Sequence, residues 1–439
     1  MRALKGVSAR LLMKEYGDEL KKKLWGGHLW NPSYFIATVS ENTEEQIRDI
    51  FKVKNKNRRV VDLFMKIIIK GFKYRIYPTK EQEIQLNKTF GCVRFVYNQI
   101  LAKKIDLYKN ESKSISKTIC NNYCNRELKK EYPWLKEVDK FALTNSIYNL
   151  DSAYQKFFKE HTGFPKFKSK KNHYYSYTTN FTNNNIKVDF ENNKIQLPKL
   201  KWIKAKLHKE FQGRILFATV SKTPSNKYFV SLNIECEHQE LKQNNNKIAM
   251  DLGIKDLLIT SNGTKIDNKK LSYKYEQKLA KLQRQIAKKK IGSNNWRKQR
   301  IKIARLHEKI ANIRKDNLHK ISHKIVKENQ LIFSENLNIK GMVKNHNLAK
   351  SIHDCGWYEL TRQLTYKSEW NNRIYHKVDR FHPSSQLCNV CGYKNEDTKN
   401  LNIRFWECLQ CHTKHDRDEN ASINILNQGL KELKLEKVS

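Results

Sequence analysis

The sequence contains no long hydrophobic stretch. No run of 18 apolar residues occurs in its 439 residues, and a membrane-spanning helix needs about that length. The first five residues, MRALK, also lack the apolar core of a secretory signal peptide. These absences argue against a membrane protein and a secreted one, so we expect no membrane partner and a cytoplasmic location.

Acidic residues are scarce relative to basic ones. Asp and Glu total 44 against 86 Lys and Arg, which gives a formal net charge of +42. This excess makes nucleic acid the expected partner, because each neutralised phosphate releases counterions. The hydrophobic content of 38% still permits packed cores, and the length fits roughly two to four domains. Composition alone leaves open a ribosomal or merely basic protein.

Four of the nine cysteines form two CxxC pairs, Cys388 with Cys391 and Cys408 with Cys411. The 16 residues between the pairs are typical of a zinc ribbon, and Gly392 follows the first pair, as such knuckles favour. Four thiolates leave no open position for water, so we predict a structural Zn²⁺ site. The other cysteines are scattered and are expected to be reduced: Cys92, Cys120, Cys124, Cys236 and Cys355.

Three acidic residues follow or open apolar segments at wide spacing. Asp251 ends the run IAMD, Glu335 ends the run LIFSE, and Asp418 opens the helix-like segment DENASINI. A carboxylate at the end of a hydrophobic strand is costly unless it binds something, usually a metal. The order of strand Asp, later strand Glu and late helix Asp is that of an RNase H-like nuclease. On so basic a chain, we predict Mg²⁺ facing a phosphodiester.

A two-metal nuclease needs several carboxylates that converge on ions about 3.5–4 Å apart. Asp256 and Asp416 are local competitors for this role. Asp256 is expected in the turn beyond the strand end, and Asp416 just before the helix. We therefore prefer Asp251 and Asp418, and keep Asp416 as a supporting residue.

The rest of the chain shows clear periodicities. Residues 66–77 predict a strand, and residues 79–160 are helical in pattern. Several short strands are expected over 183–240, which together with 66–77 close a small barrel. Residues 271–328 predict an antiparallel hairpin of two basic helices, broken near 291–295.

Aromatic and basic residues alternate in the segment from 163 to 177. Such a segment suits stacking on bases while contacting phosphates. The alternative is a solvated loop with a few buried rings. The candidate nucleic-acid-binding residues are Lys166, Lys168, Lys170, Lys171, Tyr174, Tyr175 and Tyr177.

Several motifs resemble the TnpB (OrfB) family of transposon proteins, which is related to type V CRISPR effectors. The resemblance runs from about residue 65 to about residue 430. It rests on GCVRFVYN at 91–98, GFPKF at 163–167, DLGIKD at 251–256, ENLNIKGM at 335–342, PSSQLC at 383–388 and HDRDENA at 415–421. It implies a multidomain α/β and α+β protein with a RuvC/RNase H-like nuclease domain, a wedge β-barrel, a helical recognition lobe and an inserted zinc ribbon.

The resemblance also implies an activity and its partners. It implies an RNA-guided, Mg²⁺-dependent DNA endonuclease in which Asp251, Glu335 and Asp418 form the metal-binding triad of a two-metal site. The guide RNA would derive from the transposon end, and the target would be double-stranded DNA with a short flanking motif. The residues that read this motif stay unassigned. A prokaryotic, nucleoid-associated location follows from the same resemblance.

The first 64 residues resemble a different family. The segments LKGVSAR at 4–10 and LWGGHLW at 24–30 look like the C-terminal half of TnpA, the single-tyrosine transposase of the same elements. That family needs a paired-histidine motif and a nucleophilic tyrosine. Here His28 stands alone, Ile50 and Phe51 occupy the place of the tyrosine, and Tyr34 is a poor substitute. We predict a fused remnant that cannot cleave DNA.

Together these observations predict a domain plan. We expect the remnant over 1–64, the first wedge strand over 65–82, the recognition lobe over 83–180, the rest of the wedge barrel over 181–244, the nuclease domain over 245–380, the zinc ribbon over 381–414 and the last nuclease helix with the tail over 415–439. Two other functions stay open: a non-cleaving RNA- and DNA-binding regulator of transposition, and a transposase acting through a tyrosine.

Overall fold

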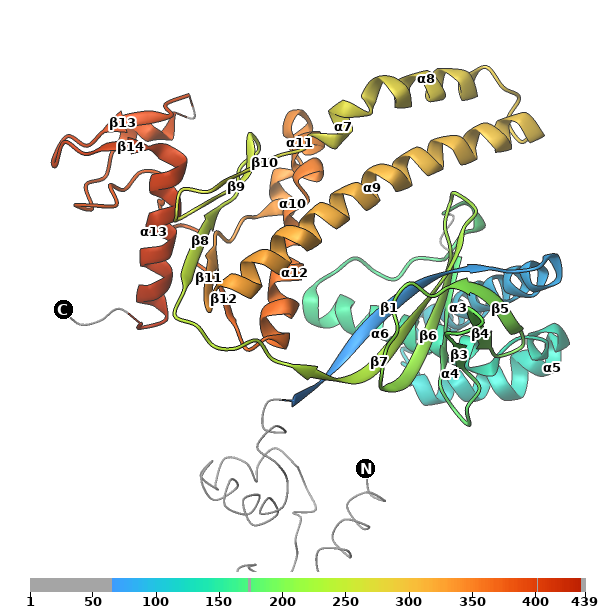
Figure 1. The fold of residues 1–439 in the computed structure, drawn as a ribbon. Helices are drawn as coiled ribbons and strands as arrows, with labels where there is room; N and C mark the ends of the chain where they lie inside the picture. The colour runs from blue at the N-terminus through green and yellow to red at the C-terminus, as the bar shows by residue number, and fades with distance from the viewer. Residues whose placement is uncertain (1–64, 173–174, 401, 436–439) are drawn as a thin grey trace, which may run out of the picture. The chain divides into compact units, whose positions relative to one another are not determined.

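A computed structural model describes residues 65–172, 175–400 and 402–435. The chain divides between Phe64 and Met65, and the fold below is that of the second unit (Figure 1). The predictions for residues 1–64 and for Tyr174 lie outside the described residues.

The first helical segment begins after a strand and starts with a capping box. Thr79 accepts a hydrogen bond from the Gln82 backbone, and the Gln82 side chain accepts one from the Thr79 backbone, which satisfies two donors at the helix start. The helical pattern expected over 79–160 is present, and its apolar residues Leu143, Ile147 and Leu150 are buried. The elements are α3 (Lys80–Glu111), α4 (Lys117–Tyr123), the π-helix η4 (Cys124–Leu128), α5 (Lys129–Glu131), the 3₁₀ helix η5 (Pro133–Lys136) and α6 (Lys140–Glu160).

Seven strands form one antiparallel sheet in the order β2-β6-β7-β1-β5-β4-β3. The longest ladder joins β1 to β7, from Met65 opposite Gln239 to Ile76 opposite Tyr228. Strands β2 and β3 are the two edge strands of this order, and no pairing joins them in the described residues. Closure of the sheet into a barrel therefore stays a prediction. The strands are β1 (Met65–Tyr77), β2 (Tyr175–Asn180), β3 (Lys187–Asp189), β4 (Lys194–Leu197), β5 (Lys201–Lys206), β6 (Arg214–Lys222) and β7 (Tyr228–Gln239).

Strand β2 differs from the domain plan, which began this part of the sheet at residue 181. It pairs along its full length with β6, from Tyr175 opposite Lys222 to Asn180 opposite Phe217. The physical reason is alternation, because Tyr177 and Thr179 point inward and are buried. Their aromatic and β-branched side chains also favour an extended backbone.

Five strands form a second, mixed sheet in the order β10-β9-β8-β11-β12. The first three strands are antiparallel, whereas β8, β11 and β12 run parallel. The turn at 261–264 closes a hairpin between β9 and β10. The strands are β8 (Lys247–Asp251), β9 (Asp256–Thr260), β10 (Lys265–Asp267), β11 (Leu331–Ser334) and β12 (Ile374–Lys377).

Helices cover both faces of this mixed sheet (Figure 1). On one face, Ala249 and Phe333 pack against α13. A Cβ at Gly429 of α13 would lie 2.1 Å from Phe333, so the close approach requires glycine. The helices are α7 (Leu271–Lys274), α8 (Glu276–Ala287), α9 (Asn294–Glu328), α10 (Ile339–Met342), α11 (His346–Cys355), α12 (Trp357–Trp370) and α13 (Arg417–Glu432).

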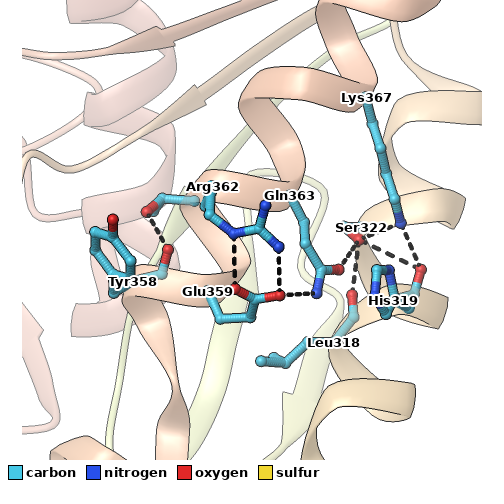
Figure 2. A network of polar contacts seen from close by, with 9 residues as sticks. Leu318, His319, Ser322, Tyr358, Glu359, Arg362, Gln363 and Lys367 are labelled. Atoms are coloured by element: carbon cyan, nitrogen blue, oxygen red, sulfur yellow. Dashed lines mark hydrogen bonds and ion pairs between the residues drawn. The ribbon is translucent and has the colours of Figure 1, made fainter. Parts of the chain in front are cut away.

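The other face of the sheet packs against α9 and α12, which a buried polar network joins (Figure 2). Ser322 of α9 donates a hydrogen bond to Gln363 of α12 at 2.8 Å and accepts one from Lys367 at 2.7 Å. Gln363 in turn donates to Glu359 at 2.9 Å. Burial lowers the pKa of Lys367 to about 8. The network pairs the buried polar groups and fixes the register of the two helices.

The predicted hairpin of basic helices is present as α8 and α9 (Figure 1). Its seam is apolar, with Leu306 and Ile310 of α9 packed against Leu279 and Leu282 of α8. The two pairs of cysteines lie beside a small ribbon of β13 (Phe405–Glu407) and β14 (Lys414–Asp416), with the 3₁₀ helix η7 at Glu396–Lys399. Among the described helices, none has the length and apolar content that crossing a membrane would require.

Candidate functional site

The first two acidic residues of the predicted triad lie at the ends of neighbouring parallel strands. Met250 of β8 lies opposite Ser334 of β11, so Asp251 and Glu335 follow at the same edge of the sheet. Alternation places Asp251 on the same face as Ala249, and that face packs against α13. The fold therefore directs both carboxylates toward the helix that carries Asp418.

The electrostatics of these residues confirm their proximity. Burial raises the pKa of Asp251 well above its usual value, and the neighbouring Glu335 and Asp418 carboxylates raise it further. Burial also raises the pKa of Glu335. Crowded carboxylates with raised pKa values have an excess of negative charge that a cation would relieve. Carboxylate oxygens are the ligands that Mg²⁺ prefers.

The third carboxylate lies in the first turn of α13 and has a cationic partner. Arg404 donates to both oxygens of Asp418, at 3.0 and 3.2 Å. Within the described residues, the three carboxylates do not gather within 4.8 Å as the cysteine sulfurs do. The ion pair with Arg404 thus neutralises Asp418 at the rim of the Asp251–Glu335 pair.

The two competing aspartates have different positions. Asp416 is the N-cap of α13 and accepts hydrogen bonds from the backbone of Asp418 at 3.0 Å and of Glu419 at 3.3 Å. It also forms an ion pair of 2.6 Å with Lys265. Asp416 therefore supports the helix that presents Asp418. Asp256 opens β9 rather than lying in the preceding turn.

A hydrogen-bonded loop before Cys388 reaches the candidate site, and the sequence patterns did not reveal it. Ser384 donates to a carboxylate oxygen of Glu335 at 3.1 Å. The buried Asn424 of α13 donates to the backbone carbonyls of Ser384 at 2.8 Å and of Leu387 at 2.6 Å. Asn420, one turn earlier, also donates to Leu387, at 2.7 Å. The spacing of the two asparagines on one helical face was the available signal.

The four cysteines predicted to bind zinc come together. The Sγ atoms of Cys388 and Cys411 are 3.6 Å apart, those of Cys391 and Cys408 are 3.5 Å apart, and all four lie within 4.8 Å of one another. A tetrahedral site with Zn–S bonds of about 2.3 Å has sulfurs about 3.8 Å apart. The cluster therefore fits a structural zinc ion with four thiolate ligands.

The surroundings of the sulfurs favour the same conclusion. Hydrogen bonds from Thr413 lower the pKa of Cys411, which favours the thiolate form that a metal binds. His415, which sequence reasoning missed, lies 3.1 Å from the Cys388 sulfur through Nε2. Metal ligands usually have such a hydrogen-bonded neighbour. His415 is also buried against the ring of Trp406, with ring centroids 4.7 Å apart.

The predicted nucleic-acid-binding segment divides into exposed and buried parts. Lys166, Lys170 and Lys171 are exposed. Lys168 lies over the ring of Tyr97 at 4.0 Å. Tyr177 is only 4% exposed and packs on Phe90, so its ring belongs to the core and its position does not support base stacking.

Comparison with known families divides the chain into matching segments. Residues 230–346 match the OrfB family of IS605 elements, described as "Probable transposase". Residues 357–425 match a "Cas12f1-like, TNB domain", and residues 1–50 match "Transposase IS200 like". Residues 65–113 match a "Helix-turn-helix domain", although the structure has strand β1 and the single helix α3 there.

Two curated relatives match most of the chain. A protein of Streptomyces pristinaespiralis named "Putative RNA-guided DNA endonuclease" is 36% identical over 83% of this chain and 90% of its own length. The Escherichia coli K12 protein InsQ, with the same description, is 31% identical over 82% of this chain and 92% of its own length.

A solved structure shares the fold. It is the Cas12f1 chain in a cryo-EM structure of a Cas12f1–sgRNA–target DNA complex, with a TM-score of 0.53 and 14% sequence identity. The match covers 82% of this chain and 99% of that chain. The described fold is accordingly a mixed α/β fold that resembles Cas12f1, with a cysteine cluster of zinc-ribbon type.

Proposed function

The chain belongs to the TnpB (OrfB) family, and from this membership we propose that it is an RNA-guided DNA endonuclease of an insertion-sequence transposon. The observation that carries the proposal is the convergence of Asp251, Glu335 and Asp418 from two parallel strands and one helix. A buried pair of carboxylates with a third carboxylate at its rim suits metal-dependent hydrolysis of a phosphodiester better than binding alone.

We further propose that the mixed sheet is a RuvC/RNase H-like nuclease domain. Its support is the strand order, in which three antiparallel strands continue into two parallel ones, with helices on both faces. In this scheme residues 245–380 and 415–439 form the nuclease domain, 381–414 the zinc ribbon, 65–82 and 181–244 the wedge barrel, and 83–180 the helical recognition lobe. Strand β2 (Tyr175–Asn180) belongs to the range 83–180 but pairs with β6, so the wedge sheet extends into the recognition lobe of this scheme.

The chemistry of the site assigns a task to each residue. Bound Mg²⁺ would supply an activated water and stabilise the charge that develops on the phosphate. Asp251, Glu335 and Asp418 would hold two such ions, and Ser384 orients the Glu335 carboxylate through its hydrogen bond. Asp418 would exchange the Arg404 guanidinium for the metal, because both compete for the same oxygens.

The partners follow from charge and from the relatives. We propose that the +42 chain binds a guide RNA from the transposon end and double-stranded target DNA with a short flanking motif. The exposed Lys166, Lys170 and Lys171 are candidates for phosphate contacts. A location in the cytoplasm, at the nucleoid, belongs to the same proposal.

We make a separate proposal for the origin of the first 64 residues. Their similarity to IS200-like transposases covers residues 1–50, yet the segment has neither the paired histidines nor the nucleophilic tyrosine of that chemistry. We propose that this segment is a fused remnant without strand-transfer activity.

The deciding experiment starts from RNA that copurifies with the full chain. This RNA is sequenced, and purified protein with the RNA and Mg²⁺ is then incubated with plasmids that carry guide-matched sites and randomised flanks. We expect guide-matched cutting that Asp251→Ala abolishes. A bound RNA without cutting of any target would instead support the non-cleaving regulator. Absence of any specific RNA would refute RNA guidance.

A further inference from the structure

A cavity of about 580 Å³ lies where helix α3, strand β2, the β6–β7 turn and helix α9 meet. Its described lining contains no carboxylate, although five of its side chains are cationic. We call it the cationic pocket and define it by Arg94, Lys170, Lys222, Arg297 and Arg300. Such a concentration of positive charge disfavours an empty, dry pocket and favours an anion.

Contacts of Glu308 hold α9 against the turn between β6 and β7, next to the pocket. Glu308 of α9 accepts a hydrogen bond from Ser225 at 2.6 Å and forms an ion pair of 3.0 Å with Lys227. Both partners lie in the turn between β6 and β7 or at its end. Through these two contacts Glu308 joins the turn of the sheet to α9.

The surface of α3 that faces the pocket has an open space beside Gly91. No neighbouring residue of the described chain fills it. Gly91 lies inside α3, where glycine destabilises a helix relative to alanine. A Cβ at Gly91 would meet no atom within 4 Å. Asn87 and Arg94 lie on the same helical face, so the gap opens directly onto the charged lining.

The partly buried ring of Tyr175 belongs to the wall and is backed by Phe90, whose own ring is buried. Phe90 and Tyr175 lie with ring centroids 5.9 Å apart and tilted by 50°. A site with cations for a phosphate, an aromatic wall and a bare backbone surface matches the parts of a nucleotide. Its volume is also within the usual range for ligands of that size.

We propose that the cationic pocket binds one nucleotide of a bound nucleic-acid strand. Its phosphate lies among Arg94, Arg297 and Arg300, and its sugar or base lies against Gly91 and the aromatic wall. The identity of the strand rests on the proposed function, but binding in the pocket does not depend on cleavage. Guide RNA and target DNA have the same phosphate chemistry, so the experiment must separate them.

The first test compares two cations of the same helix in the full chain. Arg297→Ala removes a lining charge, whereas Lys302→Ala removes an exposed charge of α9 outside the lining. Titration with the copurified RNA and with a single-stranded DNA oligonucleotide should show roughly a tenfold loss of affinity for Arg297→Ala for at least one strand. We expect less than about a twofold loss for Lys302→Ala. Equal losses of affinity in the two variants would overturn the proposal, because they would reflect only the overall positive charge of the protein.

The second test uses Gly91→Leu, which fills the gap without changing charge. Leucine is a better helix former than glycine, so the unfolding temperature should stay the same or rise. Affinity for the same nucleic acid should nevertheless fall roughly tenfold. If affinity is unchanged in a folded Gly91→Leu protein, no ligand approaches the helix there and the pocket is not a nucleotide site.

Photo-crosslinking identifies the strand. Guide RNA containing 4-thiouridine, or target DNA containing 4-thiothymidine, is irradiated in the assembled complex of the Asp251→Ala protein, and crosslinked peptides are sequenced. A crosslink at residues 87–94 or 297–301 from RNA assigns the pocket to the guide, and one from DNA assigns it to the target. Crosslinks that leave both peptides untouched with either strand would reject the proposal. The crosslinking result does not depend on cleavage, so it can be interpreted even if the protein shows no guided cutting.

Discussion

At the residue scale, Asp251 is the most informative side chain of the site. Its pKa is raised first by burial and then by two neighbouring carboxylates. A group with a raised folded-state pKa favours folding only while it is protonated. The contribution is therefore fully present below the unfolded pKa of about 3.9 and is lost as pH rises through the folded pKa.

The first prediction follows from this dependence of stability on pH. In metal-free protein at neutral pH, Asp251→Asn should unfold at a higher temperature than the unchanged chain, because it removes a buried like charge. The difference should vanish as the pH falls toward 4, and Mg²⁺ should stabilise only the unchanged chain. Differential scanning fluorimetry with and without Mg²⁺ measures both effects. Asp256→Asn is the control, and an equal gain in that variant would contradict a specific role of Asp251.

Ser384 offers a second prediction at this scale. Its hydrogen bond lowers the pKa of Glu335, against the larger effect of burial. Ser384→Ala should therefore raise this pKa and move the acid limb of the pH–rate profile of cleavage to higher pH. We also expect a rate lower by roughly 10- to 100-fold at neutral pH. Ser384→Thr keeps the hydroxyl and should restore the position of the limb; a limb that stays in place in Ser384→Ala would remove Ser384 from the site.

At the element scale, helix α13 serves three tasks along one helix. Its first turn presents Asp418, its buried asparagines bind the loop before Cys388, and its apolar face packs on the mixed sheet. Each task depends on the helix starting at the same residue. The start is fixed by Asp416, which accepts two backbone hydrogen bonds.

The cap gives a third prediction, which separates support from metal binding. Asp416→Ala should destabilise the protein by about 1 kcal/mol and slow cutting, because the first turn that holds Asp418 frays. Asp416→Asn keeps a capping oxygen and should recover most of the stability and the rate. Chemical denaturation and cleavage assays measure the two. If Asp416→Asn loses cutting completely, Asp416 is itself a metal ligand.

The elements also show what sequence patterns reveal. The strand that ends at Asp251, the strand that Glu335 follows and the hairpin of α8 and α9 were predictable, because apolar runs and helical stripes are local signals. Strand β2 was not, since its pairing with β6 is a long-range choice and its tyrosines also suit an exposed loop. The contact of Ser384 with Glu335 joins residues 49 positions apart, and no local periodicity contains it.

The zinc ribbon is the element that connects the two candidate sites. Cys388 directly follows Leu387, whose carbonyl accepts hydrogen bonds from both asparagines of α13. The same loop carries Ser384, which contacts Glu335. The cysteine cluster therefore fixes the loop at Cys388, and α13 holds both the adjacent Leu387 and the more distant Ser384.

A fourth prediction follows from this connection. Cys408→Ala, or removal of zinc by a chelator, should slow cutting strongly and make residues 384–411 sensitive to limited proteolysis, while RNA binding persists. Atomic absorption should show loss of zinc. Cys236→Ala removes a buried cysteine of β7 outside the cluster and should keep the zinc content. Unchanged protease resistance and cutting after zinc loss would contradict the structural link.

At the scale of the whole molecule, the division of the chain matters most. The contacts split it between Phe64 and Met65; three family models match segments after the split, and one matches residues 1–50 before it. Local sequence signals differ across this division, because the motifs before and after it belong to different families. They did not predict how elements distant in sequence form the cationic pocket, which requires the assembled fold.

The fifth prediction concerns this division. A protein of residues 65–439 should bind the copurified RNA and cut guide-matched plasmid at about the rate of the full chain. All triad carboxylates, the four clustered cysteines and the cationic pocket lie in that part, and residues 1–64 contain no paired-histidine motif. Its thermal unfolding should keep the Mg²⁺ response expected for the unchanged chain. A fragment that folds and binds RNA but no longer cuts would show that residues 1–64 take part in catalysis and are more than a remnant.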